Sequence, residues 1–137
     1  MRVLLDTNVL VAALIAPSGS PHSLFEAFLG DRFTLITGEM QIEEFSRVTR
    51  YPAIRSRIHP AQAGRMLNAI RSLAINVESS SIQSISPDPH DDYLFALAKA
   101  GAADYLVTGD KADVLALPRY ERTQIVTVRK LIGILKL

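Results

Sequence analysis

The amino-terminal segment opens with an apolar run that has no polar face. Residues 3–5 are Val, Leu and Leu, a pattern typical of a strand that is covered on both sides in a parallel sheet. The run ends at Asp6, and Thr7 and Asn8 then supply capping residues before a helix that is predicted from Val9. This order predicts a carboxylate at the carboxyl end of a strand, where open α/β sheets bind ligands.

Strand and helix patterns alternate along the rest of the chain. Short β-branched or aromatic runs predict strands, and apolar residues at intervals of three and four predict helices. Further strands are predicted at residues 33–36, 74–77, 105–107 and 124–127. Helices are predicted at residues 9–16, 20–29, 39–50, 60–73, 90–100, 110–115 and 128–135, with a serine-rich loop at 79–86. The alternation predicts an α/β fold in which a parallel sheet carries helices on both faces.

Two predicted strands end in aspartate, at Asp6 and at Asp110. In a doubly wound sheet both side chains project into the same crevice. Taken alone, Asp6 is equally well explained as a cap of the next helix. Two helices carry further acids that could reach this crevice, and the helical wheel distinguishes adjacent acids on each of them.

On the helix at 39–50, Glu44 lies about 100° from the centre of the buried face and Glu43 roughly 160° away. Glu44 is therefore predicted to border the core and Glu43 to face water. On the helix at 90–100, Asp91 lies roughly 70° from the buried direction, whereas Asp92 falls on the solvent side. Either aspartate alone is explained as a helix-start acid that is favoured by the helix dipole.

The amino-acid composition limits which metal ions these acids could bind. The chain of 137 residues has no cysteine, which excludes disulfides, thiolate zinc sites and cysteine nucleophiles. Four acids that share one crevice repel one another, and a divalent cation relieves that repulsion. Ligands that are all oxygen favour Mg²⁺ or Mn²⁺, ions that polarise phosphoryl oxygens and lower the pKa of bound water.

Charge is unevenly distributed although the net charge is only +1. Residues 46–77 contain no acid, and all fourteen acids lie outside this segment. Its arginines are Arg47, Arg50, Arg55, Arg57, Arg65 and Arg71. Such a run is usually a solvated face, but a guanidinium group also donates two hydrogen bonds to phosphate oxygens. A surface that contacts the phosphates of a nucleic acid is therefore predicted here, at Arg47, Arg50, Arg55, Arg57 and Arg65.

Four segments in this order resemble the signature motifs of PIN domains. They are Leu4-Leu5-Asp6-Thr7-Asn8-Val9-Leu10, Glu44 ahead of Arg47-Val48, Pro89-His90-Asp91-Asp92-Tyr93-Leu94 and Leu106-Val107-Thr108-Gly109-Asp110-Lys111. The resemblance covers nearly the whole chain, as one PIN domain over residues 1–137. It is closest to the toxin components of toxin–antitoxin pairs, relatives of the virulence-associated protein C toxins.

The resemblance implies a three-layer α/β/α sandwich and an Mg²⁺-dependent (or Mn²⁺-dependent) endoribonuclease that cuts single-stranded RNA. The catalytic and metal-binding acids of the family fall on Asp6, Glu44, Asp91 and Asp110, with Asp92 as an auxiliary ligand and Asn8 and Thr108 as supporting residues. His90 departs from the acid or lysine expected among close relatives, at a position that is no ligand. Family likeness also implies a small antitoxin partner and a homodimer.

Other classes of protein remain open at this stage. A structure-specific DNA nuclease shares the site chemistry, although the chain is short for an extra helical clamp. A metal-binding α/β module without catalysis would need a glycine-rich turn or paired acids after the first strand. A degenerate PIN scaffold that binds RNA or a protein is disfavoured by the complete acid set. No apolar stretch is long enough to span a membrane, so a cytoplasmic protein is expected.

Overall fold

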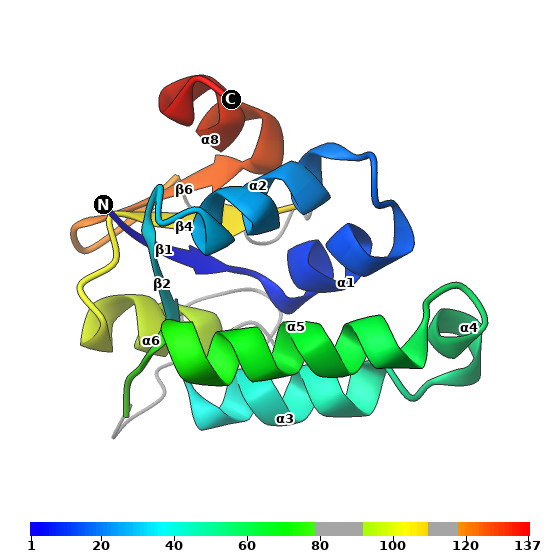
Figure 1. Ribbon diagram of the computed structural model, residues 1–137. Helices are drawn as coiled ribbons and strands as arrows, with labels where there is room; N and C mark the ends of the chain where they lie inside the picture. The colour runs from blue at the N-terminus through cyan, green and yellow to red at the C-terminus, as the bar shows by residue number, and fades with distance from the viewer. Residues whose placement is uncertain (79–91, 110–117) are drawn as a thin grey trace.

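A sheet runs through the middle of the computed structural model, which describes residues 1–78, 92–109 and 118–137 (Figure 1). Within these residues the sheet has six strands in the order β3-β2-β1-β4-β6-β5. Five of them are parallel, and β5 is antiparallel to β6. The strands are β1 (Arg2–Leu5), β2 (Thr34–Thr37), β3 (Ile75–Asn76), β4 (Tyr105–Thr108), β5 (Arg119–Tyr120) and β6 (Thr123–Thr127).

Helices cover both faces of this sheet, so the fold is a three-layer α/β/α sandwich, as the alternation of elements predicted. The described helices are α1 (Thr7–Ile15), α2 (Ser20–Leu29), α3 (Glu39–Val48), α4 (Pro52–Arg55), α5 (Pro60–Leu73), α6 (Asp92–Ala100) and α8 (Val128–Leu135). None of them is long and apolar enough to cross a membrane.

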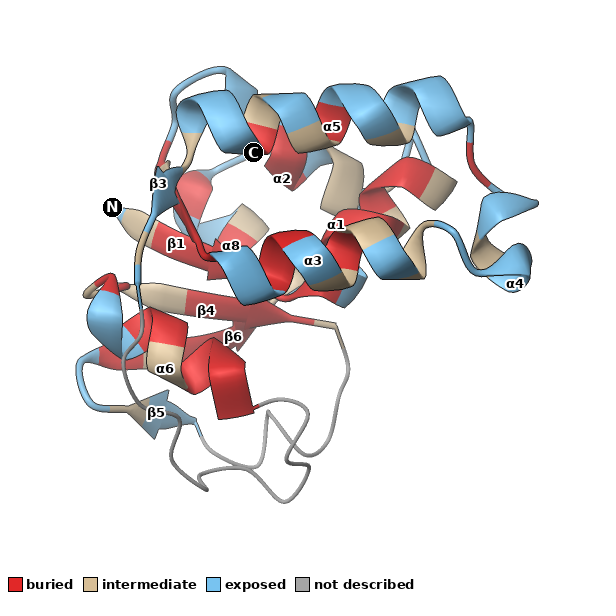
Figure 2. Ribbon diagram, turned by 90° about the horizontal axis from the view of Figure 1, so that it is seen from below, coloured by how far each residue is buried: buried red, intermediate tan, exposed pale blue. Residues whose placement is uncertain are grey.

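The strand β1 is buried on both of its faces, which explains why its sequence is apolar throughout. Val3 and Leu5 belong to a core cluster that includes residues of α1, α2, α5 and α8, whereas Leu4 belongs to a second cluster with α6. Successive side chains of a strand point to opposite faces, so a strand that is buried on both faces must be apolar throughout. Figure 2 shows α6 on one side of the buried strands and α1, α3 and α5 on the other.

Two glycines allow α6 to approach the strands and the start of α3. A methyl group at Gly38 would lie 2.5 Å from Leu97 Cδ2, and one at Gly101 would lie 2.6 Å from Ile36 Cγ2. Both distances are shorter than carbon atoms tolerate, so larger residues would push α6 away from the sheet. This packing places Leu97, past the middle of α6, beside the start of α3.

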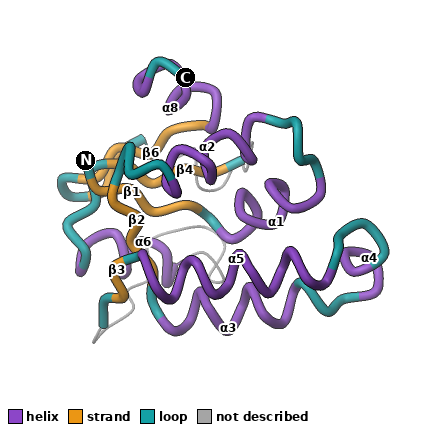
Figure 3. The backbone as a smooth tube through the Cα atoms, in the orientation of Figure 1, coloured by secondary structure: helices purple, strands orange, loops and turns teal. Residues whose placement is uncertain are grey.

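Helices α3 and α5 lie along one another in opposite directions, with α4 at the far end of the pair (Figure 3). Helix α4 contributes no buried residue. The sequence predicted that Pro52 would end the preceding helix, and it missed this short helix. The resulting hairpin holds most of the acid-free, arginine-containing segment.

Several predicted boundaries differ from the structure. Helix α1 begins at Thr7 because Asp6 itself occupies the cap position, so the prediction of a start at Val9 was two residues late. Helix α3 ends at Val48 instead of residue 50. The edge strand β5 was not predicted, since two residues are too few to give a period. The predicted loop at 79–86 and the helix at 110–115 lie outside the described residues.

Candidate active site

Asp6 lies at the carboxyl end of β1, next to the end of β4. Leu5 pairs with Val107 in the parallel register, and the Asp6 amide donates to the Val107 carbonyl over 2.8 Å. From β1 the strand order continues to β2 and β3 in one direction and to β4 and β6 in the other. The boundary between β1 and β4 is therefore the topological switch point of the sheet, where α/β proteins bind ligands. The prediction for the place of Asp6 is confirmed.

The Asp6 carboxylate is only 2% exposed and is held by both neighbouring elements. Its Oδ1 accepts from the backbone amide of Asn8 over 3.2 Å, and its Oδ2 accepts from Thr108 Oγ1 over 3.2 Å. Asp6 therefore caps α1 and also faces the crevice. The side chain of Thr108 donates to this carboxylate, whereas the side chain of Asn8 is exposed and only its backbone amide donates.

A buried tyrosine connects α6 to α3 and to the start of α1. The hydroxyl of Tyr93 donates to Glu44 Oε1 over 2.5 Å and lies 3.0 Å from Thr7 Oγ1. Burial, followed by the hydrogen bond to Glu44, raises the pKa of Tyr93 above its usual range. A neutral phenol donates its proton to the carboxylate, so the Thr7 hydroxyl donates to the tyrosine oxygen. Thr7 follows Asp6 directly, and these hydrogen bonds therefore link the two acids.

The wheel prediction for the two glutamates of α3 is confirmed. Glu44 is half-buried beside Tyr93, whereas Glu43 is exposed. Ile42 and Phe45 form the buried face of the helix, and Glu44 lies at its border. A carboxylate at position 43 therefore points to the solvent, and one at position 44 points to the site.

A buried glutamine fixes the start of α3 to the ends of two strands. Gln41 Nε2 donates to the Leu5 carbonyl over 2.6 Å, and Thr37 Oγ1 donates to Gln41 Oε1 over 2.8 Å. Both side chains are almost fully buried. The first bond pairs the last carbonyl group of β1 with a donor. Together the two bonds fix the rotation of α3 about its own axis, and this rotation determines the direction of the Glu44 side chain. Gln41, Thr7 and Tyr93 were not among the predicted site residues, because their hydrogen bonds join elements that are far apart in the sequence.

Asp92 does not face the solvent, and that prediction was wrong. It is 5% exposed, at the first residue of α6. Tyr93, Leu94 and Phe95 are buried as well, so the first turn of this helix is enclosed on all sides. A wheel assumes that a helix has one buried and one solvated face, and this turn has no solvated face. A buried carboxylate needs partners, and Asp92 interacts with other groups of the protein.

The predicted ligands Asp91 and Asp110 lie outside the described residues. Among the residues that the structure describes, no three potential ligands form a group. Asp6 and Glu44 are hard oxygen donors, one fixed by two hydrogen bonds and the other by a tyrosine, and they are linked through two hydroxyls. This donor chemistry fits Mg²⁺ or Mn²⁺.

The arginines predicted to bind RNA are all exposed, but they occupy separate places. Arg50 and Arg55 line a cavity of about 380 Å³ between α3, α4 and α5. Arg47 lies on the Glu44 side of α3 and donates from Nε to Tyr51 Oη over 3.3 Å. Arg65 lines a different groove, beside α1 and α2. The structure therefore brings Arg50 and Arg55 together and sets Arg65 apart.

Comparison with known proteins assigns the chain to a family. The family model described as PIN domain matches residues 2–112, which span β1 through the end of β4. The chain belongs to the PIN domain family. PIN domains are generally metal-dependent nucleases, which supports a hydrolase activity of this chain. The chain is also similar to an uncharacterised protein of Methanocaldococcus jannaschii, at 24% identity over 118 residues, 85% of this chain and 75% of that protein.

Proposed function

We propose that this PIN domain is an Mg²⁺-dependent or Mn²⁺-dependent endoribonuclease that hydrolyses single-stranded RNA. The observation that carries the proposal is the link Asp6–Thr7–Tyr93–Glu44 at the switch point of the sheet. It brings the carboxylates of Asp6, after β1, and Glu44, on α3, to the carboxyl ends of the parallel strands. The hydroxyls of Thr108 and Tyr93 donate to these carboxylates and fix their orientation. Asp91 and Asp110 complete the proposed ligand set, and Asp92 is the proposed auxiliary acid.

In this proposal the side chains of the protein hold the ligand carboxylates in place, and the bound ion provides the positive charge that the reaction needs. A bound divalent cation polarises a phosphoryl oxygen and lowers the pKa of bound water. Thr108 and the first turn of α1 keep the Asp6 carboxylate in place, and Tyr93 keeps Glu44 in place. Hydrogen bonds of this kind orient ligand carboxylates, and their loss typically weakens metal affinity or activity about 10-fold to 100-fold.

A single stripe of α3 suggests the path of the RNA. Met40, Glu44 and Arg47 follow one another at intervals of four and three, so they lie along one side of the helix. Met40 is 51% exposed and Tyr51, to which Arg47 donates, is 47% exposed. Exposed apolar and aromatic groups on both sides of Glu44 suit unpaired bases, which stack on such groups. Arg50 and Arg55 extend the path with positive charge.

We also propose that the protein is the toxin of a toxin–antitoxin pair, a homodimer that a small antitoxin inhibits. The support is the motif resemblance together with one surface feature. A groove of about 280 Å³ between α1, α2 and α5 is lined largely by apolar side chains, among them Leu14, Phe25 and Leu29. Apolar grooves between helices accept amphipathic partner helices. Growth arrest on expression, relieved by the product of a neighbouring short reading frame, is the expected result.

The test of the enzymatic proposal uses matched substrates. The purified chain is incubated with Mg²⁺ and an end-labelled single-stranded RNA, or with the DNA of the same sequence. We expect internal cleavage of the RNA and an intact DNA. Cleavage of the DNA alone would instead establish a DNA nuclease, and an inert protein with a bound divalent ion would establish a non-catalytic module.

A further inference from the structure

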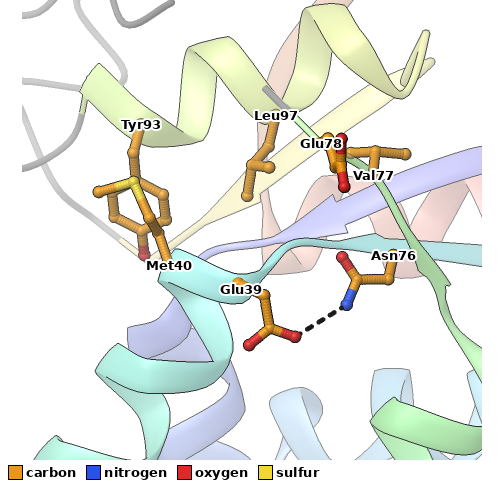
Figure 4. A pocket seen from close by; sticks show the side chains of 7 residues that line it. All are labelled: Glu39, Met40, Asn76, Val77, Glu78, Tyr93 and Leu97. Atoms are coloured by element: carbon orange, nitrogen blue, oxygen red, sulfur yellow. Dashed lines mark hydrogen bonds between the residues drawn. The ribbon is translucent and has the colours of Figure 1, made fainter. Parts of the chain in front are cut away.

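A second cavity adjoins the candidate site at the amino-terminal end of α3. It has a volume of about 700 Å³ and lies between the start of α3, the end of β3 and α6. Its lining residues are Glu39, Met40, Asn76, Val77, Glu78, Tyr93 and Leu97. Tyr93 lines this cavity and also donates to Glu44, so one side chain belongs both to the cavity and to the candidate site. Figure 4 shows the side chains of these residues.

The floor of this cavity is apolar and the rim is polar. Tyr93 and Leu97 are buried and come from α6, and Val77 is partly buried. Met40 stands on the rim with half of its surface exposed. A flexible thioether over an apolar floor suits a flat ring, because methionine adapts its shape and packs favourably on aromatic systems. The volume is ample for one nucleobase.

The polar groups on the rim have a defined hydrogen-bonding character. Asn76 Nδ2 donates to Glu39 Oε1 over 3.3 Å, and Figure 4 shows this bond between the two side chains. A carboxylate only accepts, so the amide nitrogen, not its oxygen, faces Glu39. One proton of that nitrogen remains available. The rim therefore offers carboxylate acceptors at Glu39 and Glu78 and an amide donor at Asn76.

Charge excludes phosphate as the ligand of this cavity. Its described lining contains two carboxylates and no cationic side chain. A carboxylate repels the RNA backbone but accepts hydrogen bonds from the amino and imino groups of bases. Uracil has no amino group, and adenine and cytosine each have one. Guanine presents two adjacent donors, N1–H and the 2-amino group, beside an acceptor, O6, and so it matches a carboxylate next to an amide donor.

We propose that this cavity is a nucleobase pocket that selects guanine beside the cleavage site. Glu39 accepts from N1–H and the 2-amino group, Asn76 donates to O6, and Met40 covers the ring. Glu78 adds a second carboxylate to the lining and keeps phosphate out. The inference rests on the proposed function, because it names a base of the RNA substrate.

The test measures binding in EDTA, so that it does not depend on cleavage. Fluorescein-labelled heptanucleotides of uridine, with a central G, A, C or U, are titrated with the protein and followed by anisotropy. We expect the G heptamer to bind about tenfold more tightly than the U heptamer, the effect of one good bidentate contact. Glu39→Gln and Asn76→Ala should each reduce the ratio between the affinities for the G and U heptamers severalfold.

Glu43→Gln is the matched control, since Glu43 is exposed on the same helix and does not line the cavity. It should retain the full preference. Equal affinities for the four heptamers, or a preference that survives Glu39→Gln, would overturn the inference and leave an acidic surface for a cationic protein partner. Repeating the assay with Mg²⁺ separates the two proposals. Cleavage without a base preference would refute only the guanine pocket, and a base preference without cleavage would refute only the nuclease activity.

Discussion

The hydroxyl of Tyr93 donates a hydrogen bond to the carboxylate of Glu44 over 2.5 Å. Forty-nine positions separate the two residues in the sequence, and α6 and α3 bring them together. Because burial raises the pKa of Tyr93, the phenol keeps its proton and remains a donor. The same oxygen accepts from Thr7, beside Asp6. One side chain thus orders both ends of the candidate site.

Replacement of Tyr93 by Phe should weaken activity without unfolding the protein. The substitution keeps the ring and removes only the hydroxyl that orients Glu44. Loss of a hydrogen bond to a charged group corresponds to about 1.4 kcal/mol, or about tenfold in cleavage rate. The Mg²⁺ concentration for half-maximal rate should rise as well. An unchanged rate and an unchanged Mg²⁺ requirement would show that Tyr93 is only a packing residue.

The arginines near α4 should govern the salt dependence of RNA binding. Replacing Arg50, Arg55 and Arg57 together by Ala should weaken binding and lower the salt slope by up to about one unit for each phosphate group that is no longer neutralised. Arg65→Ala is the control, because Arg65 lines the groove beside α1 and α2. If the triple variant keeps the wild-type slope, these arginines form a solvated face or a surface for a protein partner.

The free energy of unfolding should depend on pH through Asp104. This residue lies at the amino ends of the parallel strands, and the candidate site lies at their carboxyl ends. The backbone amide of Arg2 donates to its Oδ2 and Arg122 to its Oδ1, each over 2.8 Å. The Arg2 hydrogen bond, with a smaller contribution from Arg122, lowers the pKa of Asp104, and partial burial opposes the shift. The stabilisation is therefore complete above the unfolded pKa of about 3.9 and is lost as pH falls through the folded pKa.

Asp104→Asn consequently should lower the free energy of unfolding at pH 7, and the difference from the wild type should shrink below about pH 4. Urea unfolding of both proteins at pH 7 and at pH 3 checks this expectation. Cleavage at pH 7 serves as the control and should not change, because Asp104 lies at the amino ends of the strands. A difference that grows toward acid would contradict the assignment.

Cleavage should require a divalent cation. We expect activity with Mg²⁺ or Mn²⁺, none in excess EDTA and full recovery when Mg²⁺ is restored, because carboxylates alone do not activate water strongly enough near neutral pH. Recovery distinguishes removal of the ion from unfolding of the protein. Undiminished cleavage in EDTA would rule out the metal mechanism.

The sequence predicted features that depend on one element or on its order in the chain. The apolar run before Asp6 was sufficient to place this residue at a strand end, and the single buried face of α3 separated Glu44 from Glu43. The prediction failed at Asp92 because α6 is enclosed at its first turn by neighbours that a wheel does not contain. The hydrogen bonds of Tyr93 could not be predicted, since they depend on how closely α6 approaches α3.

The most direct test compares two adjacent glutamates of the same helix. Wild-type protein, Glu44→Gln and Glu43→Gln are compared in Mg²⁺ for the rate at which they cleave single-stranded RNA, after circular dichroism has shown that all three are folded. Glu44→Gln should reduce the rate by on the order of 100-fold or more, which corresponds to about 2.7 kcal/mol. Glu43→Gln should cleave at nearly the wild-type rate. An inactive Glu43→Gln beside an active Glu44→Gln would contradict this account of the site.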